Sequence, residues 1–514
     1  MFFRPLTIYL LVFLYSPGLA PGLEPVLRLA KIFQDQMVLQ RGKRVPVWGH
    51  TKPNSKIMVH FGHQQRETIS GEKGSWRVLL QPMEASRHGK SLTVESEGLV
   101  VTIKGVLVGD VWHASGQSNM AMNVGSVAAR LDEARQDRER ADLPSIRYCR
   151  LNAGQSKIAL SDFSDIVTWQ VCGPKTVGGF SATAFYFARR LHQELDVPIG
   201  VIDSSRGGTP IEPFIPRVAF GRHPPLRKEL ELGDKEDLSG IWSLPGGVRA
   251  RDGNWLPGRL FHSRLAPLKR FPVKGLIWYQ GESNCGDGED PRDYRYKMQA
   301  LIEGWRKEFG DPEMPCYFVQ LPGSGARKDW PYLREQQRLS LSLPRTAMVV
   351  TIDLLDTDIH PANKLDVGKR LAQLALTETY GQAGTVCGPL FQRAELRKRK
   401  TGGQEYVVSF SHAGSGLTVA RKTGTKPPQP APELRLQHFE LATADRNWFP
   451  ASAKIVKNRV IVHSKKVNQP IAVRYAYAID PQHCYLFNKE GFPASPFCSR
   501  PDLLMAEVDL PKDP

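Results

Sequence analysis

The chain has 514 residues, which is too long for one hydrophobic core and predicts two or three domains. Hydrophobic residues make up 41% and charged residues 24%, a globular composition that excludes a wholly disordered chain. The formal net charge of +17 makes nucleic acid a partner to consider. A basic balance by itself, however, indicates solubility and non-specific attraction rather than an activity.

The first residues have the pattern of a secretory signal peptide. Arg4 precedes an apolar run over residues 6–15, and small residues follow up to Ala20. The run is too short to span a bilayer, and no other window approaches a membrane span. We therefore expect a signal peptide over residues 1–22, a secreted or periplasmic location, and no membrane association after cleavage.

The cysteines give no metal-binding pattern. All seven are scattered, without a C-x-x-C pair or the spacing of zinc ligands. In an exported protein some could form disulfides, and Cys484 and Cys498 are the pair nearest in sequence. The odd count leaves at least one cysteine unpaired within the chain. We predict neither a metal site nor a cofactor.

Three regions with different patterns of apolar and polar residues follow one another along the chain. Residues 25–104 contain short alternating runs separated by turn residues, the pattern of a small β-sandwich. Residues 105–384 alternate apolar strands with helical periodicity, which predicts a mostly parallel sheet covered on both faces. Residues 385–514 return to β-rich runs. In the middle region we expect strands over 105–111, 198–203, 275–279, 316–320 and 346–353, and helices over 181–195, 293–309 and 366–380.

A serine motif directly follows the first of these strands. Residues 115–120 read Ser-Gly-Gln-Ser-Asn-Met. A serine at a strand-to-helix turn is raised above the carboxyl edge of a parallel sheet, where its hydroxyl is accessible. Taken alone, such a serine is more often part of a turn or a helix cap. The motif therefore needs support from other segments.

Polar residues follow three further strands of the same region. After the strand that ends near residue 203, Gly207 and Gly208 allow the backbone N–H groups to approach a ligand. After residue 279, Gln280 offers an amide donor and Glu282 a carboxylate. After the last strand, His360 lies among several carboxylates, one of which could orient its imidazole.

The arrangement of these four segments is more informative than any one of them. All follow predicted strands, so all lie at the same edge of one sheet. Together they supply a nucleophile, oxyanion donors, an orienting acid and a general base. This is the set of groups that an ester hydrolase requires.

Several blocks resemble the sialate O-acetylesterase family of the SGNH hydrolase superfamily. The resemblance spans nearly all of the chain after the leader, and its blocks are residues 106–112, 115–120, 198–200, 207–212, 278–284, 360–361 and 491–497. It implies an α/β fold, with a flavodoxin-like three-layer SGNH hydrolase domain flanked by N-terminal and C-terminal β-sandwich-like accessory domains. It also implies metal-free removal of O-acetyl groups from sugars.

The resemblance assigns roles to individual residues. Ser118 matches the nucleophile and His360 the catalytic base, while Gly207, Gly208 and Gln280 match the oxyanion blocks. The third member of the triad stays open between Asp358 and Glu282. The superfamily pattern expects an Asp three residues before the His, where this chain has Thr357, whereas related sugar acetylesterases use the Glu of the block that contains Glu282.

Other functions are compatible with parts of this pattern. The sugar could be acetylated xylan or another polysaccharide rather than a sialic acid, because loops between the blocks select the sugar. A non-catalytic carbohydrate-binding protein would not need both Ser118 and His360. Nucleic-acid binding is disfavoured, because the densest basic run, residues 397–400, lies in a predicted hairpin without interleaved aromatic residues.

Overall fold

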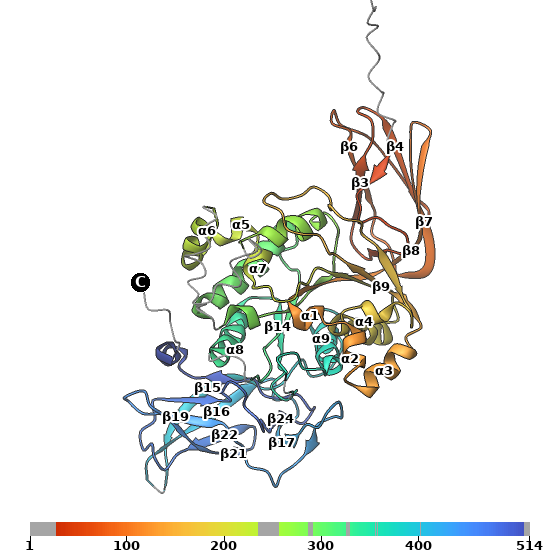
Figure 1. The fold of residues 1–514 in the computed structure, drawn as a ribbon. Coiled ribbons are helices and arrows are strands. Elements are labelled where there is room, and N and C mark those ends of the chain that lie inside the picture. The colour runs from red at the N-terminus through yellow and green to blue at the C-terminus, as the bar shows by residue number, and fades with distance from the viewer. Residues whose placement is uncertain are drawn as a thin grey trace, which may run out of the picture.

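The computed structural model describes residues 27–234, 256–285, 291–324, 329–354, 356, 358–400 and 402–507. The predicted signal peptide, residues 1–22, lies outside this part of the chain. Three regions follow one another in Figure 1: an N-terminal β region, a central region of strands and helices, and a C-terminal β region. No helix among the described residues is long and apolar enough to cross a membrane.

The N-terminal region is built from two sheets. One has the order β1-β3-β6; in the other β5, β4, β7 and the first part of β8 pair in sequence. The alternation of buried and exposed residues predicted in this region is present, most clearly in β6. The strands are β1 (Arg28–Leu29), β2 (Val38–Gln40), β3 (Val45–His50), β4 (Lys56–Phe61), β5 (Gln64–Ile69), β6 (Ser75–Leu80), β7 (Ser86–Ser96) and β8 (Leu99–Gly116).

Strand β8 connects the N-terminal region to the central sheet. It runs without a break over 18 residues, its first part antiparallel to β7. From Asp110 onward it pairs in parallel with the central strands β11 and β12. The domain boundary predicted between residues 104 and 105 therefore falls inside one continuous strand.

The central sheet has the order β10-β9-β11-β8-β12-β13-β14. All neighbours are parallel except the edge pair β10 and β9, as predicted for a mostly parallel sheet. The strands other than β8 are β9 (Leu143–Arg150), β10 (Trp169–Cys172), β11 (Ile199–Asp203), β12 (Gly275–Tyr279), β13 (Cys316–Val319) and β14 (Thr346–Val349).

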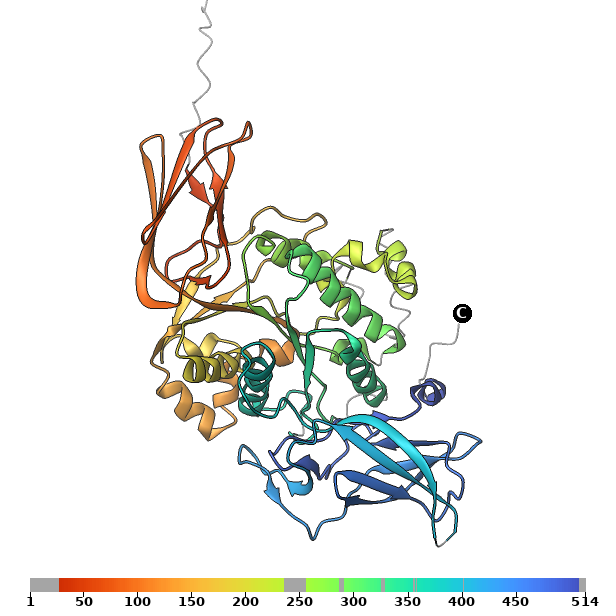
Figure 2. The same cartoon turned by 180° about the vertical axis from the view of Figure 1, so that it is seen from behind.

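Helices pack on both faces of this sheet (Figures 1 and 2). Residues of β12 point alternately to the two faces: Leu276 and Trp278 join one hydrophobic cluster with α7 and α8, and Ile277 and Tyr279 join another with α4 and α9. The predicted helices are present with small shifts of their ends. The helices are α1 (Ser118–Ala121), α2 (Val124–Ala128), α3 (Asp132–Glu139), α4 (Ala182–Leu195), α5 (Arg217–Phe220), α6 (Arg227–Asp234), α7 (Tyr294–Glu308), α8 (Trp330–Leu339) and α9 (Lys364–Glu378).

The C-terminal region consists of three small sheets, of order β15-β16-β22-β21, β18-β17-β24 and β20-β19-β23-β25. The basic run over residues 397–400 lies at the predicted hairpin between β15 and β16. The strands are β15 (Leu390–Lys398), β16 (Gln404–Ser411), β17 (Leu417–Arg421), β18 (Gln429–Pro430), β19 (Phe439–Ala442), β20 (Trp448–Pro450), β21 (Ser452–Val456), β22 (Arg459–His463), β23 (Ala472–Tyr475), β24 (Leu486–Asn488) and β25 (Phe497–Cys498).

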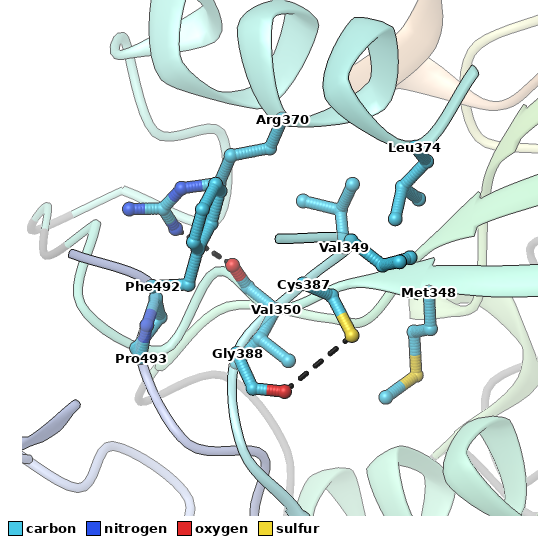
Figure 3. Close-up of a pocket in the computed structure, with 10 residues that line it drawn as sticks. Met348, Val349, Val350, Arg370, Leu374, Cys387, Gly388, Phe492 and Pro493 are labelled. Carbon is cyan, nitrogen blue, oxygen red and sulfur yellow. Dashed lines mark hydrogen bonds between the residues drawn. The ribbon is translucent and has the colours of Figure 1, made fainter. Parts of the chain in front are cut away.

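The C-terminal region also packs against the central region. Figure 3 shows Phe492 and Pro493 beside Arg370 and Leu374 of α9 and the end of β14. A loop from the C-terminal region, residues 422–428, reaches further along α9. In this loop Lys422 forms a 2.7 Å ion pair with Asp366, and Gly424 O accepts a hydrogen bond from Asn363, the residue that caps α9. Thr425 donates to Glu133 of α3.

The cysteines do not form the disulfides that the sequence made possible. All seven are free and buried, so no disulfide links Cys484 to Cys498. Each of these two sulfurs instead approaches a main-chain carbonyl near in sequence, at Pro481 and Arg500. Proximity in sequence did not bring the two thiols together, because Cys484 lies in the loop before β24 and Cys498 lies in β25.

His113 of β8 is a buried titratable group behind the carboxyl edge of the sheet. Its Nε2 lies 2.8 Å from Ser204 Oγ, which donates to Ser115 Oγ at 2.9 Å. Burial lowers the pKa of His113 to about 3. The imidazole is therefore neutral in the folded protein over the pH range in which an unfolded histidine takes up a proton.

We expect Gly368→Ala to destabilise the protein. An added Cβ would lie 2.5 Å from Tyr186 Cβ and 2.8 Å from the Phe187 backbone nitrogen, so α9 would have to move away from α4. The expected loss is about 1–3 kcal/mol of unfolding free energy, measured by denaturant unfolding. Gly179→Ala is the control, because its methyl group meets open space. A Gly368→Ala protein as stable as wild type would contradict this packing.

We also expect His113→Gln to weaken the loss of stability in acid. An unfolded histidine binds a proton near pH 6.5 and the folded one only near pH 3. Between these values the unfolded state holds more protons, so this group's contribution to stability falls as the pH is lowered. Unfolding free energies at pH 7 and pH 4.5 should differ less in His113→Gln than in wild type. If the change in unfolding free energy between pH 7 and pH 4.5 were the same in both proteins, His113 would not be a source of the acid sensitivity.

Candidate active site

The candidate site lies where the chain reverses its direction across the sheet. Strand β8 comes first in the chain but sits in the middle of the parallel sheet, between β11 and β12. In open α/β sheets, ligands bind at the carboxyl ends of the strands at such a reversal. The predicted segments after β8, β11, β12 and β14 all begin at this edge.

Ser118 is held at the end of β8 by a turn that requires glycine. Gly116 has φ +134°, and a Cβ there would lie 2.1 Å from Tyr279 O of the neighbouring strand. The next backbone N–H, of Gln117, donates to that same Tyr279 carbonyl at 3.0 Å. Ser118 then begins the short helix α1 and is half-buried. The turn therefore places its hydroxyl at the surface of the sheet edge.

His360 reaches Ser118 from the segment between β14 and α9. Its Nε2 lies 2.8 Å from Ser118 Oγ, within hydrogen-bond distance. On the other side of the ring, Nδ1 lies 3.4 Å from Asp358 Oδ1. The same carboxylate oxygen accepts the backbone N–H of His360 at 3.1 Å. Ser118, His360 and Asp358 thus form one connected series.

Arg130, at the end of α2, fixes the segment that carries the histidine. Its guanidinium donates to the His360 carbonyl at 2.8 Å and to Asp356 at 2.7 Å, and lies 3.5 Å from Asp358. Slight desolvation of Asp358 opposes ionisation, but the His360 backbone N–H and the charges of His360 and Arg130 prevail and lower its pKa. Asp358 is therefore an anion beside the imidazole.

Glu282 lies at the same sheet edge but does not contact the imidazole by a hydrogen bond. It begins a short 3-10 turn (Glu282–Asn284) after β12 and is buried. Its Oε1 accepts a hydrogen bond from Asn119 Nδ2. Burial raises its pKa, although Asn119 and the charges of Lys364 and His360 act in the opposite direction. Of the two carboxylates predicted as orienting acids, Asp358 is the one that faces His360.

The predicted oxyanion donors separate into two groups. Gly207 lies next to Ser118, since a Cβ there would be 3.7 Å from Ser118 Cβ. The Gly207 and Ser118 backbone N–H groups have no acceptor among the described residues. Gly208 has φ +66° and faces open space. It shapes the turn that follows β11.

Gln280 differs from its prediction. Its side chain is completely buried, and its Nε2 donates to Asn284 Oδ1 at 2.7 Å and to Gln117 Oε1 at 3.1 Å. Its Oε1 accepts from Tyr294 at 2.8 Å. The amide N–H groups therefore join the segment after β12 to the Ser118 turn, which leaves them engaged with Asn284 and Gln117 rather than available as oxyanion donors.

Three residues of the site were not singled out from the sequence: Asn119, Arg130 and Lys364. Asn119 directly follows Ser118, so its place in the motif was visible but its contacts were not. Lys364 lies in the first turn of α9 and is completely buried, whereas a lysine at a helix start usually indicates an exposed position. In the described part of the chain, no three His, Cys, Asp or Glu side chains gather in a group that could hold a metal ion.

Comparisons with known proteins agree with this geometry. Residues 250–377 match the family model described as carbohydrate esterase, sialic acid-specific acetylesterase. A sialate O-acetylesterase from Rattus norvegicus is 27% identical over 97% of this chain and 98% of its own length. A sialate O-acetylesterase from Homo sapiens is 28% identical over 91% of this chain and 92% of its own.

A solved structure provides the corresponding match in three dimensions. A carbohydrate acetylesterase from Xanthomonas citri is 33% identical, covers 92% of this chain and 99% of its own, and has a TM-score of 0.79. The likeness therefore extends over the N-terminal, central and C-terminal regions together. On these findings the chain belongs to the sialate O-acetylesterase family and is a carbohydrate esterase.

Proposed function

We propose that the protein is a serine O-acetylesterase that removes acetyl groups from sugars. In this proposal Ser118 is the nucleophile, His360 the general base and Asp358 the acid that orients the imidazole. The observation that carries the proposal is the 2.8 Å contact between Ser118 Oγ and His360 Nε2 at the carboxyl edge of β8. A hydroxyl paired with an imidazole, which is itself paired with a carboxylate, is the arrangement that activates a serine.

The reaction follows from these groups in two halves. Ser118 Oγ attacks the acetyl carbonyl carbon while His360 Nε2 accepts the hydroxyl proton. The tetrahedral intermediate then expels the sugar oxygen, which takes that proton from His360, and Ser118 is left acetylated. In the second half His360 removes a proton from water while the water oxygen attacks the acetyl-serine. The intermediate then expels Ser118 Oγ, which takes that proton from His360, and the acetic acid that leaves gives its own proton to the solvent.

The developing oxyanion needs donors close to the nucleophile. The backbone N–H groups of Ser118 and Gly207 fit this role, because a Cβ at Gly207 would lie only 3.7 Å from Ser118 Cβ and neither N–H is engaged within the described residues. Of the donors that the family resemblance implies, this proposal keeps Gly207 and does not use Gln280. Since nucleophile, base and oxyanion donors all come from the chain, we propose that hydrolysis requires no metal ion or cofactor.

We also propose the finer architecture that the family resemblance implies. The central region would be a flavodoxin-like three-layer SGNH hydrolase domain, and residues 25–104 and 385–514 would be accessory β domains. The parallel strand order and the helices on both faces support the first assignment. Export by a signal peptide over residues 1–22 is supported by the sequence pattern alone.

The substrate class is the least constrained part of the function. Curated relatives over nearly the whole chain are sialate O-acetylesterases, which favours an acetylated sialic acid. An acetylated xylan or another polysaccharide is the alternative. A purely carbohydrate-binding role is disfavoured, because binding alone does not need a serine and a histidine at hydrogen-bond distance.

The decisive measurement is acetate release from a panel of O-acetylated sialic acids and acetylated xylo-oligosaccharides. We expect wild type to release acetate in the presence of EDTA and to prefer the sialic acids. Preference for the xylo-oligosaccharides would leave the reaction in place and change the substrate. Activity lost in EDTA and restored by a divalent cation would contradict the metal-free mechanism.

Ser118→Ala should abolish acetate release and hydrolysis of 4-nitrophenyl acetate, because no other hydroxyl contacts His360 in the described residues. The far-ultraviolet circular dichroism and the melting temperature should stay at wild-type values. Ser126→Ala, on the exposed side of the neighbouring helix α2, is the matched control and should keep full activity. Activity of Ser118→Ala within threefold of wild type would reject the serine mechanism.

The two carboxylates should respond differently to neutralisation. Asp358→Asn removes the anion that faces His360 Nδ1, and we expect kcat to fall by up to about 10⁴-fold. Glu282→Gln retains an oxygen that can accept from Asn119 and should cost much less. Because both carboxylates act on one serine–histidine pair, the losses should not add in the double variant. A larger loss in Glu282→Gln than in Asp358→Asn would make Glu282 the orienting acid.

A further inference from the structure

Lys364 is an unusual residue for its place in the fold. It begins α9, four residues after His360, and its side chain is completely buried. A buried ammonium group is costly unless other groups compensate it. Its Nζ donates to Asn119 Oδ1 and lies 5.3 Å from the centre of the Tyr279 ring. Nothing in the proposed hydrolysis of the ester uses this amine directly.

Asn119, which Lys364 contacts, is connected to both Ser118 and His360. Asn119 directly follows Ser118 in α1, and its Nδ2 donates to Glu282 and, at 3.1 Å, to the carbonyl of Ile359. Ile359 directly precedes His360. One buried amide therefore joins the nucleophile turn, the end of β12, the histidine segment and the start of α9.

The groups around this amide specify its orientation. An ammonium group can only donate hydrogen bonds, so Lys364 requires the oxygen of Asn119. The Ile359 carbonyl and an ionised Glu282 can only accept, so they require its NH₂ group. If the donor at position 364 were lost, the oxygen of a completely buried amide would have no partner among the described residues. The amide would then be free to rotate or to shift.

The buried charges at this position also balance one another. Glu282 contacts Asn119 from the other side, and Asp356 and Asp358, which lie against Arg130, also act on the charge of Lys364. Burial lowers the pKa of Lys364 to about 7, and the charge of Glu282 counteracts this effect. Lysine and glutamate bridged by one amide therefore form a buried, partly compensated pair.

We infer that Lys364 is a positioning residue of the esterase: acting through the side chain of Asn119, it holds Ser118 and His360 at hydrogen-bond distance. This inference rests on the proposed serine mechanism and adds a residue to it. Lys364 touches neither the substrate nor the reacting atoms. Its effect is on the fraction of molecules in which the nucleophile and the base are aligned.

The test compares Lys364→Met with Lys364→Gln. Methionine fills a similar volume without a donor, and glutamine retains an N–H donor without a charge. We expect kcat on 4-nitrophenyl acetate to fall by about 100-fold in Lys364→Met, the size of effect that a misplacement of about 1 Å produces, with KM within about threefold of wild type. Lys364→Gln should recover part of the lost kcat.

Measuring kcat on folded protein distinguishes positioning from a structural role. Removing one partner of a buried pair destabilises a protein, so the melting temperature of Lys364→Met should fall, and kcat is measured well below that temperature on protein whose circular dichroism matches wild type. Lys369→Met, on the exposed side of the same helix, is the matched control and should change neither kcat nor melting temperature. A kcat of Lys364→Met within threefold of wild type, or a loss confined to KM, would overturn the inference.

Asn119→Asp provides a second, independent variant. Aspartate can still accept from Lys364 but can no longer donate to Glu282 and Ile359, so kcat should fall while the contact to Lys364 remains. Because both residues act through one amide, the losses of Asn119→Asp and Lys364→Met should be far from additive. Additive losses of kcat in the double variant would overturn the inference. This comparison decides the question even if Lys364→Met by itself proves unstable.

Ser118→Ala, measured in the same assay, distinguishes a failure of the serine mechanism from a failure of the positioning role of Lys364. An active Ser118→Ala protein would remove the proposed serine mechanism, whatever the behaviour of the Lys364 variants. An inactive Ser118→Ala protein together with a fully active Lys364→Met protein would leave the mechanism in place and remove only the positioning role.

Discussion

The continuous strand β8 is the constraint on which the rest of the molecule depends. Its first half belongs to the N-terminal sheet, and its second half lies in the middle of the central sheet, between β11 and β12. Because it ends at Gly116, where the backbone passes too close to Tyr279 O for any side chain, the turn that carries Ser118 is placed directly against β12. The positions of Ser118, Gly207 and the segment after β12 all follow from where this strand stops.

The site divides its polar groups between surface and interior. Ser118, His360 and Asp358 are partly exposed, as groups that meet a sugar ester must be. Of the residues that hold them, Asn119, Glu282 and Lys364 are buried, whereas Arg130 is exposed. A hydrogen bond inside the protein is electrostatically stronger than one in water, and an unpaired buried group is costly. The buried hydrogen bonds therefore allow only a few side-chain arrangements. Because Ser118 and His360 are attached to this network, their positions are restricted as well.

The sequence predicted the parts of this structure that depend on local pattern. The apolar strands and the amphipathic helices over residues 182–195, 294–308 and 364–378 follow from periodicity. Ser118 and His360 could be named because each follows a strand. The contacts of Gln280 were not predicted, because whether an amide points to the sheet edge or into the core depends on packing with Asn284 and Tyr294. Lys364 was overlooked for the same reason, since burial of a lysine is a tertiary property.

The loop over residues 422–428 changes how the C-terminal region should be regarded. It reaches across to the beginning of α9 and binds Asp366 and Asn363, within six residues of His360. A shortened enzyme that ended at residue 384 would lose these partners, and one that began at residue 105 would start inside β8. The β-rich ends are thus not interchangeable modules. Any exchange or fusion of either end has to preserve its contacts with the central region. A minimal esterase therefore cannot be obtained simply by cutting the chain where its sequence pattern changes.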